Sequence, residues 1–146
     1  MVFTIGETAN KTGISEYTLR FYEKKGLMPF VKRTSSGRRY FSEDDIDFLG
    51  LITCLKNTGM PLAEIKDFVD MTMQGDETLE KRLTIFRTQR AAVKQQIAAA
   101  QRRLEKLDFK VRYFEAACEA GTEAAVEGDC DVPNSPITIN DALRVK

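Results

Sequence analysis

The sequence predicts a mainly α-helical protein in which a small N-terminal domain precedes one long helix that pairs with a second chain. Three observations lead to this prediction. Two short helices joined by a glycine-containing turn open the chain, and a basic hairpin follows them. Apolar or small residues then recur at alternating steps of four and three through residues 77–119, where neither Pro nor Gly occurs. A chain of 146 residues has room for one such domain and this helix.

Local capping signals place the first two helices. Thr4 followed by Glu7 is a capping box, in which each side chain accepts a hydrogen bond from the other residue's backbone amide. Gly13 ends this helix, and Ser15 caps a second helix over residues 16–25. Two short helices joined by such a turn form a helix-turn-helix, a motif that places its second helix in the major groove of DNA.

The outer face of the second helix combines hydroxyl groups, aromatic rings and one guanidinium group. An arginine there can donate two hydrogen bonds to guanine, and hydroxyl groups can bind phosphates or bases. The candidate DNA contacts on this helix are Ser15, Tyr17, Thr18, Arg20, Phe21 and Tyr22. We expect one or two of the three aromatic residues to lie partly in the core. Arg20 is expected to face the DNA, because an unpaired arginine is not placed in so small a core.

A β-hairpin is predicted by two short extended runs that flank a turn at residues 34–37. Cations cluster at or beside the tip of this hairpin. Its candidate DNA contacts are Lys32, Arg33, Arg38, Arg39 and Tyr40. A basic hairpin directly after a recognition helix is typical of a wing, which contacts phosphates or the minor groove, and the alternative is a solvated loop. The N-terminal domain is thus predicted to be a winged helix-turn-helix.

Two further helices complete this DNA-binding domain, which we expect to span residues 1–75. Ser42 opens a variant capping box before the third helix, and Pro61 suits the first position of the fourth. Residues 43–76 carry eight acidic and two basic side chains, whereas residues 1–42 carry three acidic and eight basic ones. The basic segment suits a phosphate backbone, and the acidic helices are expected to face away from DNA.

The long helix is predicted over residues 76–120, with the period of 3.5 residues that is typical of a coiled coil. One copy cannot bury its own apolar stripe, so we predict a homodimer. The predicted interface residues are Leu83, Phe86, Val93, Ile97, Leu104, Leu107, Val111 and Phe114. In the alternative the helix folds back on its own domain, which is too small to cover the stripe. Residues 121–146 are predicted to form an irregular acidic tail.

Composition excludes several classes of function. No apolar run is long enough to span a membrane, and the N-terminus lacks the features of a signal peptide, so we expect a cytoplasmic protein. The chain has no histidine, no phosphate-binding glycine loop and no nucleophile beside a base, so we predict neither an enzyme nor a cofactor. The rival class is a coiled-coil adaptor that binds other proteins, but such an adaptor would not need a basic wing.

Four short motifs stand in a fixed order in the first part of the chain. They are Thr4–Glu7, Thr12–Ser15, Thr18–Leu27 and Gly37–Tyr40. Together with residues 59–65 they resemble the signature of MerR-type transcriptional regulators, and the resemblance extends from residue 1 to about residue 120. It implies an antiparallel coiled-coil dimer that binds double-stranded promoter DNA between the −35 and −10 elements. It also implies that an inducer lets the dimer bend and untwist the DNA so that RNA polymerase engages both elements.

The inducing signal is inferred from the three cysteines. Residues 49–60 resemble the aldehyde- and thiol-stress branch of the family, whose members carry a reactive cysteine at the place of Cys54; the alternative is a small buried hydrophobic residue. Cys118 and Cys130 could contribute at most a two-thiolate site for a soft metal ion, so no complete metal site is predicted. The remaining alternatives are an apolar ligand between the long helix and the fourth helix, or no small molecule at all.

Overall fold

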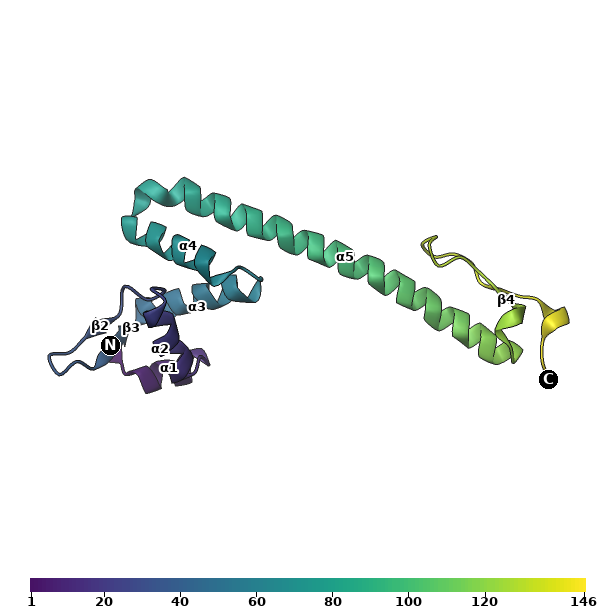
Figure 1. Cartoon of the computed structure of the whole chain (residues 1–146), viewed down its shortest axis with the longest axis horizontal. Coiled ribbons are helices and arrows are strands. Elements are labelled where there is room, and N and C mark those ends of the chain that lie inside the picture. The colour runs from purple at the N-terminus through teal and green to yellow at the C-terminus, as the bar shows by residue number, and fades with distance from the viewer. The chain divides into compact units, whose positions relative to one another are not determined.

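The computed structural model describes residues 1–146 and contains two compact units, Met1–Arg90 and Ala91–Lys146. Helices dominate, as the sequence predicts (Figure 1). The N-terminal unit contains β1 (Val2–Phe3), α1 (Ile5–Thr12), α2 (Glu16–Lys24), β2 (Lys32–Arg33), β3 (Arg39–Ser42), α3 (Glu43–Asn57), α4 (Leu62–Gln74), the 3₁₀ turn η1 (Asp76–Thr78) and the start of α5 (Leu79–Ala120). The C-terminal unit contains the rest of α5, η2 (Glu123–Ala125), β4 (Val126–Glu127), β5 (Thr138–Ile139) and η3 (Asp141–Leu143). None of the helices combines the length and apolarity that crossing a bilayer requires.

The helix-turn-helix forms as its capping signals predict. Glu7 Oε2 accepts a hydrogen bond from the Thr4 amide at 2.8 Å, and Thr4 Oγ1 accepts one from the Glu7 amide at 3.3 Å. Gly13 ends α1 in the left-handed conformation, with φ of 73°. Ser15 Oγ then accepts a hydrogen bond from the Thr18 amide at 3.1 Å and so caps α2. These local bonds set the direction in which α2 leaves the turn.

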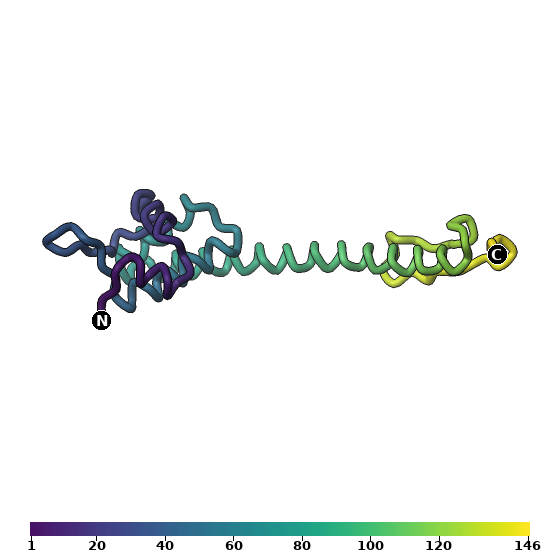
Figure 2. The backbone as a smooth tube through the Cα atoms, turned by 90° about the horizontal axis from the view of Figure 1, so that it is seen from below, coloured from purple at the N-terminus to yellow at the C-terminus, as the bar shows by residue number.

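A three-stranded antiparallel sheet holds the predicted wing, with strand order β1-β3-β2. The hairpin of β2 and β3 is confirmed, and its turn projects away from the helices (Figure 2). Strand β1 is an addition to the prediction, because two residues are too short to show an alternating pattern. Its Phe3 pairs with Phe41 of β3, and both side chains are buried. This pairing anchors the base of the wing to the N-terminus.

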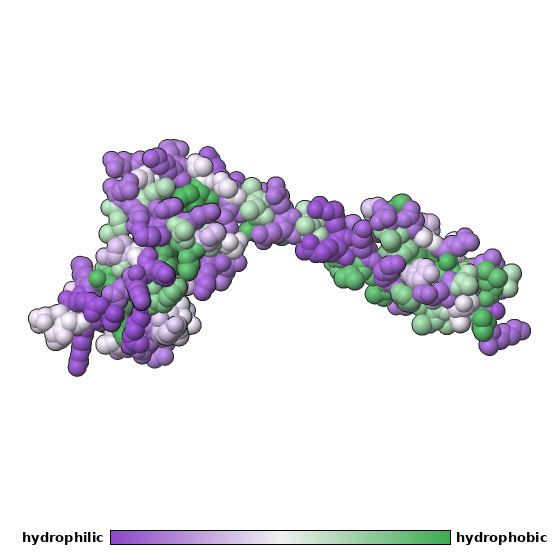
Figure 3. Space-filling model, viewed as in Figure 1, coloured by the Kyte–Doolittle hydropathy of each residue, from purple (hydrophilic) through white to green (hydrophobic).

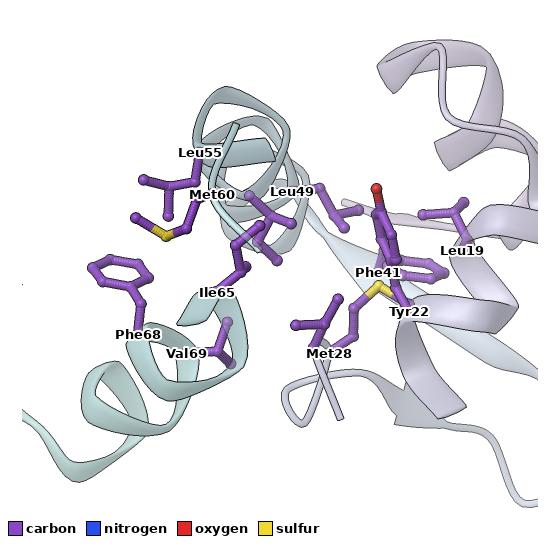
Figure 4. Packing of buried hydrophobic residues seen from close by; sticks show 12 residues of the cluster. Leu19, Tyr22, Met28, Phe41, Leu49, Leu55, Met60, Ile65, Phe68 and Val69 are labelled. Atoms are coloured by element: carbon purple, nitrogen blue, oxygen red, sulfur yellow. The ribbon is translucent and has the colours of Figure 1, made fainter. Parts of the chain in front are cut away.

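Helices α3 and α4 close the core of the N-terminal unit. Ser42 and Asp45 form the predicted capping box at the start of α3. Pro61 occupies the N-cap of α4 rather than its first helical position, so the helix begins at Leu62, one residue later than predicted. Figure 4 shows the buried side chains from α2, β3, α3 and α4 packed into one cluster. The cluster consists of Leu19, Tyr22, Leu27, Met28, Phe41, Leu49, Ile52, Leu55, Met60, Ile65, Phe68 and Val69.

A tight elbow joins α4 to α5. Gly75 has φ of 99° and ψ of −160°, a conformation that is essentially restricted to glycine. The hydroxyl of Thr78, which is 3% exposed, lies 2.7 Å from the carbonyl oxygen of Met71 and 2.8 Å from that of Gly75. Arg82 Nε donates a hydrogen bond to the same hydroxyl at 3.0 Å. One buried threonine therefore ties both helices to the turn between them.

The start of α5 packs against the N-terminal unit, which extends to Arg90 and not only to the predicted boundary at 75. The Phe86 ring meets the Phe68 ring edge-on, with centroids 5.3 Å apart. Gln89 Nε2 donates hydrogen bonds of 3.0 Å to the carbonyl and hydroxyl oxygens of Thr58. Phe86 was predicted as a dimer contact, and here it lies largely against its own unit. Phe86 thus packs between α4 and α5, the place that the sequence analysis considered for an apolar ligand.

In the C-terminal unit the heptad stripe on α5 is exposed along one side of the helix. Ile97, Leu104, Leu107, Val111 and Phe114 expose between 49% and 64% of their surface. Figure 3 shows hydrophobic surface along this part of the helix, on the side away from the tail. Val93 at the start of the stripe is half-buried. A single chain thus leaves most of this stripe in contact with solvent.

The acidic tail is more ordered than predicted, because residues 121–146 fold back onto α5. Strands β4 and β5 pair antiparallel. Asp131 accepts an ion-paired hydrogen bond from Lys106 at 3.0 Å, and Arg112 Nη1 donates to the carbonyl of Ser135 at 3.1 Å. The tail covers Phe109, which is 4% exposed and lies roughly opposite the heptad stripe at 3.6 residues per turn. The tail therefore leaves the stripe free.

We expect Thr78→Val to destabilise the N-terminal unit by about 1–3 kcal/mol, because valine keeps the shape of threonine but leaves a partly buried Arg82 donor without its acceptor. Equilibrium unfolding in urea measures this change. Thr84→Val is the matched control: its hydroxyl donates to the Glu80 carbonyl at an exposed site, and its loss should cost less than about 0.5 kcal/mol. Equal effects of the two substitutions would contradict the structural role of Thr78.

Candidate nucleic-acid interface

The N-terminal half of α2 presents an exposed polar and aromatic surface. Tyr17 is 80% exposed, and the hydroxyl groups of Ser15 and Thr18 are joined by a hydrogen bond of 2.9 Å. Arg20 is also exposed and forms an ion pair with Glu16, one helical turn earlier, at 2.8 Å. An exposed ion pair of this kind is worth little in water, so the guanidinium group can exchange its partner at small cost. The surface can therefore offer both hydroxyl and guanidinium donors to a ligand.

The two consecutive aromatic residues of α2 point toward the core. Tyr22 is only 2% exposed and belongs to the buried cluster, so its ring cannot lie in a DNA groove. The prediction that Tyr22 is a groove contact is therefore wrong, because its ring packs in the core with Phe41. Phe21 is half-buried against the same cluster. Of the three aromatic candidates on α2, only Tyr17 stands free.

The four wing cations divide into two pairs. Arg33 and Arg39 both bind the carboxylate of Glu23 on α2, Arg33 through Nη2 at 2.9 Å and Arg39 through Nε. Lys32 and Arg38 are exposed and form no ion pair. Two cations on the wing are thus held against α2, and two remain available to an anionic partner.

Arg33 also braces the turn of the wing. Its Nη1 donates a hydrogen bond of 2.9 Å to the carbonyl of Gly37, and the Thr34 amide donates to the Arg38 carbonyl at 2.8 Å. Tyr40, on β3 opposite Lys32, is half-buried. These contacts fix the shape of the basic tip before any ligand arrives.

Sequence reasoning missed Glu23, although one signal pointed to it. A carboxylate in the last turn of a helix is unfavourable beside the negative end of the helix dipole, so it calls for a nearby cation. Partial burial would raise the pKa of Glu23, but hydrogen bonds and positive charge from Arg39 and Arg33 hold that pKa below its ordinary value. The ion pairs of Glu23 thus stabilise the folded state fully above the ordinary pKa of glutamate. This stabilisation is lost as the pH falls through the lowered pKa.

Cys54 lies on α3, and its side chain is exposed. The alternative in which it is a small buried hydrophobic residue is therefore wrong for the single chain. The Cys54 carbonyl accepts a hydrogen bond from the Thr58 amide at 3.1 Å, and Thr58 in turn accepts from Gln89 of α5. The thiol therefore sits one helical turn before the residue that ties α3 to α5.

The other two thiols cannot share a metal ion within one chain. Cys130 lies with Lys106 and Arg102 around a small cavity. Cys118 is exposed on α5, three turns beyond Lys106, which is roughly 18 Å at 1.5 Å per residue. No three His, Cys, Asp or Glu side chains gather into a group that could hold a metal ion. The two-thiolate arrangement that the sequence allowed is thus not present in one chain.

Comparison with known proteins agrees with this geometry. Residues 3–72 match the family described as MerR HTH family regulatory protein, and residues 46–108 match the family described as MerR, DNA binding. An uncharacterized HTH-type transcriptional regulator of Haemophilus influenzae is 44% identical over 138 residues, which are 94% of this chain and 99% of the relative.

Solved structures show the same fold. One is HiNmlR, a MerR family regulator lacking the sensor domain, bound to promoter DNA: it is 46% identical, with a TM-score of 0.73 over 86% of this chain and 100% of the other. A MerR family transcriptional regulator from Bacillus thuringiensis is 40% identical, with a TM-score of 0.68 over 77% and 98%. The fold, the exposed helix, the basic wing and these similarities lead to one conclusion: the chain belongs to the MerR family of DNA-binding transcriptional regulators.

Proposed function

We propose that two copies of this chain pair antiparallel through the heptad stripe of α5 and bind one stretch of promoter DNA. The exposed stripe from Ile97 to Phe114 supports the pairing, because one chain leaves it in water. The tail covers the opposite side of α5 and so does not compete for the stripe. A second copy supplies the same stripe, so a two-fold dimer buries both at once.

Each α2 then enters the major groove of the DNA, and each wing lies on the adjoining backbone. Tyr17, Thr18 and Arg20 face the groove, with Arg20 leaving Glu16 for a base edge or a phosphate. Lys32 and Arg38 contact phosphates. The observation that carries this proposal is the free, exposed face of α2 beside a wing whose tip retains two unpaired cations. That HiNmlR was solved on promoter DNA supports the same role for this chain.

The dimer regulates transcription by distorting the DNA between the −35 and −10 promoter elements, so that RNA polymerase engages both. Bending and twisting a site of this size costs on the order of 1–6 kcal/mol. Several phosphate contacts from two basic wings can supply that energy. The dimer helices set the separation of the two half-sites, which must match the helical repeat of DNA.

The signal in this proposal is an aldehyde or another electrophile that adds to Cys54. Cys54 and Cys118 are both exposed, and the position of Cys54 supports this choice, because it lies in the DNA-binding unit one turn from the contact with Gln89. The sulfur adds to the aldehyde carbon, and the thiol proton moves to the carbonyl oxygen, so the adduct needs no oxidant. The added group at α3 would shift α5 relative to α2 and so change the distortion of the DNA.

Arg20→Ala and Arg38→Ala should weaken operator binding in different ways. Loss of Arg20 should cost about 1–3 kcal/mol and relax the preference at one base pair, whereas loss of Arg38 should weaken all sequences alike and reduce the salt slope by about one. Titrations of fluorescent duplexes at several salt concentrations measure both effects. Lys81→Ala, which removes an exposed cation from α5, serves as the control. Wild-type affinity in both wing and helix variants would contradict the proposed interface.

Leu107→Glu should convert the dimer into monomers. Leucine burial is worth roughly 1.5–3 kcal/mol per copy, so the loss of two copies should raise the dimer dissociation constant roughly 10²- to 10⁴-fold. Sedimentation equilibrium measures the change, and circular dichroism checks that the helix remains. Gln95→Glu places the same charge on the opposite, exposed side of α5 and should leave the dimer intact. A wild-type chain that stays monomeric at micromolar concentration would contradict the proposed dimer.

Cys54→Ser should abolish the transcriptional response to formaldehyde while leaving operator affinity in its absence unchanged. A promoter–reporter fusion measures the response, and intact mass spectrometry measures the adduct on the purified protein. Cys118 is also an exposed thiol, so Cys118→Ser is the control, and this variant should respond as the wild type does. If the Cys54→Ser protein still responds fully to the aldehyde, the signal enters elsewhere.

A further inference from the structure

Glu23 is the single acidic group between α2 and the wing, and it binds a cation from each wing strand. Arg33 comes from β2 and Arg39 from β3, and both donate to the same carboxylate. The Glu23 side chain is 24% exposed, and that of Arg39 is 26% exposed, so this pair is partly shielded from solvent. A partly buried ion pair with shared hydrogen bonds holds its geometry better than a surface pair does.

The three side chains connect parts of the chain that no other ion pair joins. Glu23 lies ten residues before Arg33 and sixteen before Arg39, so neither contact belongs to a local turn. Arg33 carries the connection onward to the Gly37 carbonyl at the tip. A movement of the wing relative to α2 must therefore break at least one of these bonds.

The geometry points to Glu23 as a positioning residue for DNA binding, one that holds the wing at a fixed angle to α2 through Arg33 and Arg39. Glu23 itself does not touch DNA, since a carboxylate is repelled by phosphates. Its two arginines are neutralised in part and serve the scaffold, whereas Lys32 and Arg38 serve the phosphates. With the angle fixed, the groove contacts of α2 and the backbone contacts of the wing fit the same duplex without further ordering. This inference rests on the DNA-binding mode proposed above.

The two arginines differ in how firmly they are held. The Arg33 side chain is 46% exposed and that of Arg39 is 26% exposed, so the contact between Arg39 and Glu23 is the better shielded of the two. Removal of the Glu23 charge would release both. A released wing would carry more free positive charge but would meet the duplex in many orientations. The expected result is stronger general attraction to DNA and weaker discrimination among sequences.

Glu23→Gln is the direct test, because glutamine keeps the size of the side chain and loses its charge. The operator is a duplex selected from a random pool by the wild-type protein, and the competitor is a scrambled duplex of equal length. We expect the ratio of operator to competitor affinity to fall at least about tenfold. Affinity for the competitor should stay the same or rise. The slope of log affinity against log salt concentration should become steeper by about one to two, because each freed arginine can contact a phosphate.

Arg39→Gln completes a double-mutant cycle with Glu23→Gln. If Glu23 acts through Arg39, its substitution should change the affinity ratio much less in the Arg39→Gln background than in the wild type. Asp70→Asn is the matched charge control, because Asp70 forms an exposed ion pair with Lys66 on α4. It removes one acidic charge from the same unit and should leave the ratio unchanged.

Thermal unfolding of each variant shows whether it is folded. If the Glu23→Gln protein does not fold, Glu23→Asp replaces it as the test variant. Aspartate keeps the charge on a shorter side chain, so the salt slope should remain that of the wild type while the ratio falls. A wild-type ratio in every folded variant at this position, or additive effects in the cycle, would overturn the inference. If the wild type selects no duplex at all, the proposed function fails, and that outcome is distinct from a failure of Glu23.

Discussion

Burial of one side of α2 against the core of the N-terminal unit is the constraint on which the exposed face of this helix depends. Leu19 and Tyr22 are fully or almost fully buried in the cluster with Phe41. At 3.6 residues per turn their burial forces Tyr17 and Arg20 to the outside. A second set of contacts reaches α3, because the Lys56 ammonium lies 5.6 Å from the centre of the Tyr22 ring. The exposed residues of α2 are thus positioned by buried residues of the same helix.

Local signals made most of the N-terminal fold predictable from the sequence. The capping pairs Thr4 with Glu7 and Ser42 with Asp45 are separated by three residues, and their hydrogen bonds need no tertiary context. The hairpin likewise follows from a turn between two short runs. Even the elbow at Gly75 was placed by its glycine, although the sequence could not tell that a short 3₁₀ turn precedes α5. In each case the determining contact lies within a few residues along the chain.

The features that the sequence did not predict depend on contacts between distant residues. The burial of Tyr22, the pairing of β1 with β3 and the folding of the tail onto Phe109 require the tertiary structure. Glu23 is the sharpest example, since its partner Arg39 is sixteen residues away. All four wing cations were predicted to contact DNA, because a formal charge in the sequence does not reveal that Arg33 and Arg39 pair with Glu23. The resemblance carried Tyr22 over as a groove contact, because a shared motif does not state which side of the helix is buried.

The division of α5 between two kinds of partner follows from the same argument about contacts. Near its start, Phe86 and Gln89 face the N-terminal unit of their own chain, whereas Leu83, another predicted interface residue, is 41% exposed. Farther along, Phe109 faces the tail, while Leu107 and Val111 face water. A helix with apolar residues on opposite sides needs two partners, and the tail can supply only one of them. The tail covers the side of α5 that carries Phe109 and leaves the heptad stripe open, so the stripe is the side on which the dimer proposed above would form.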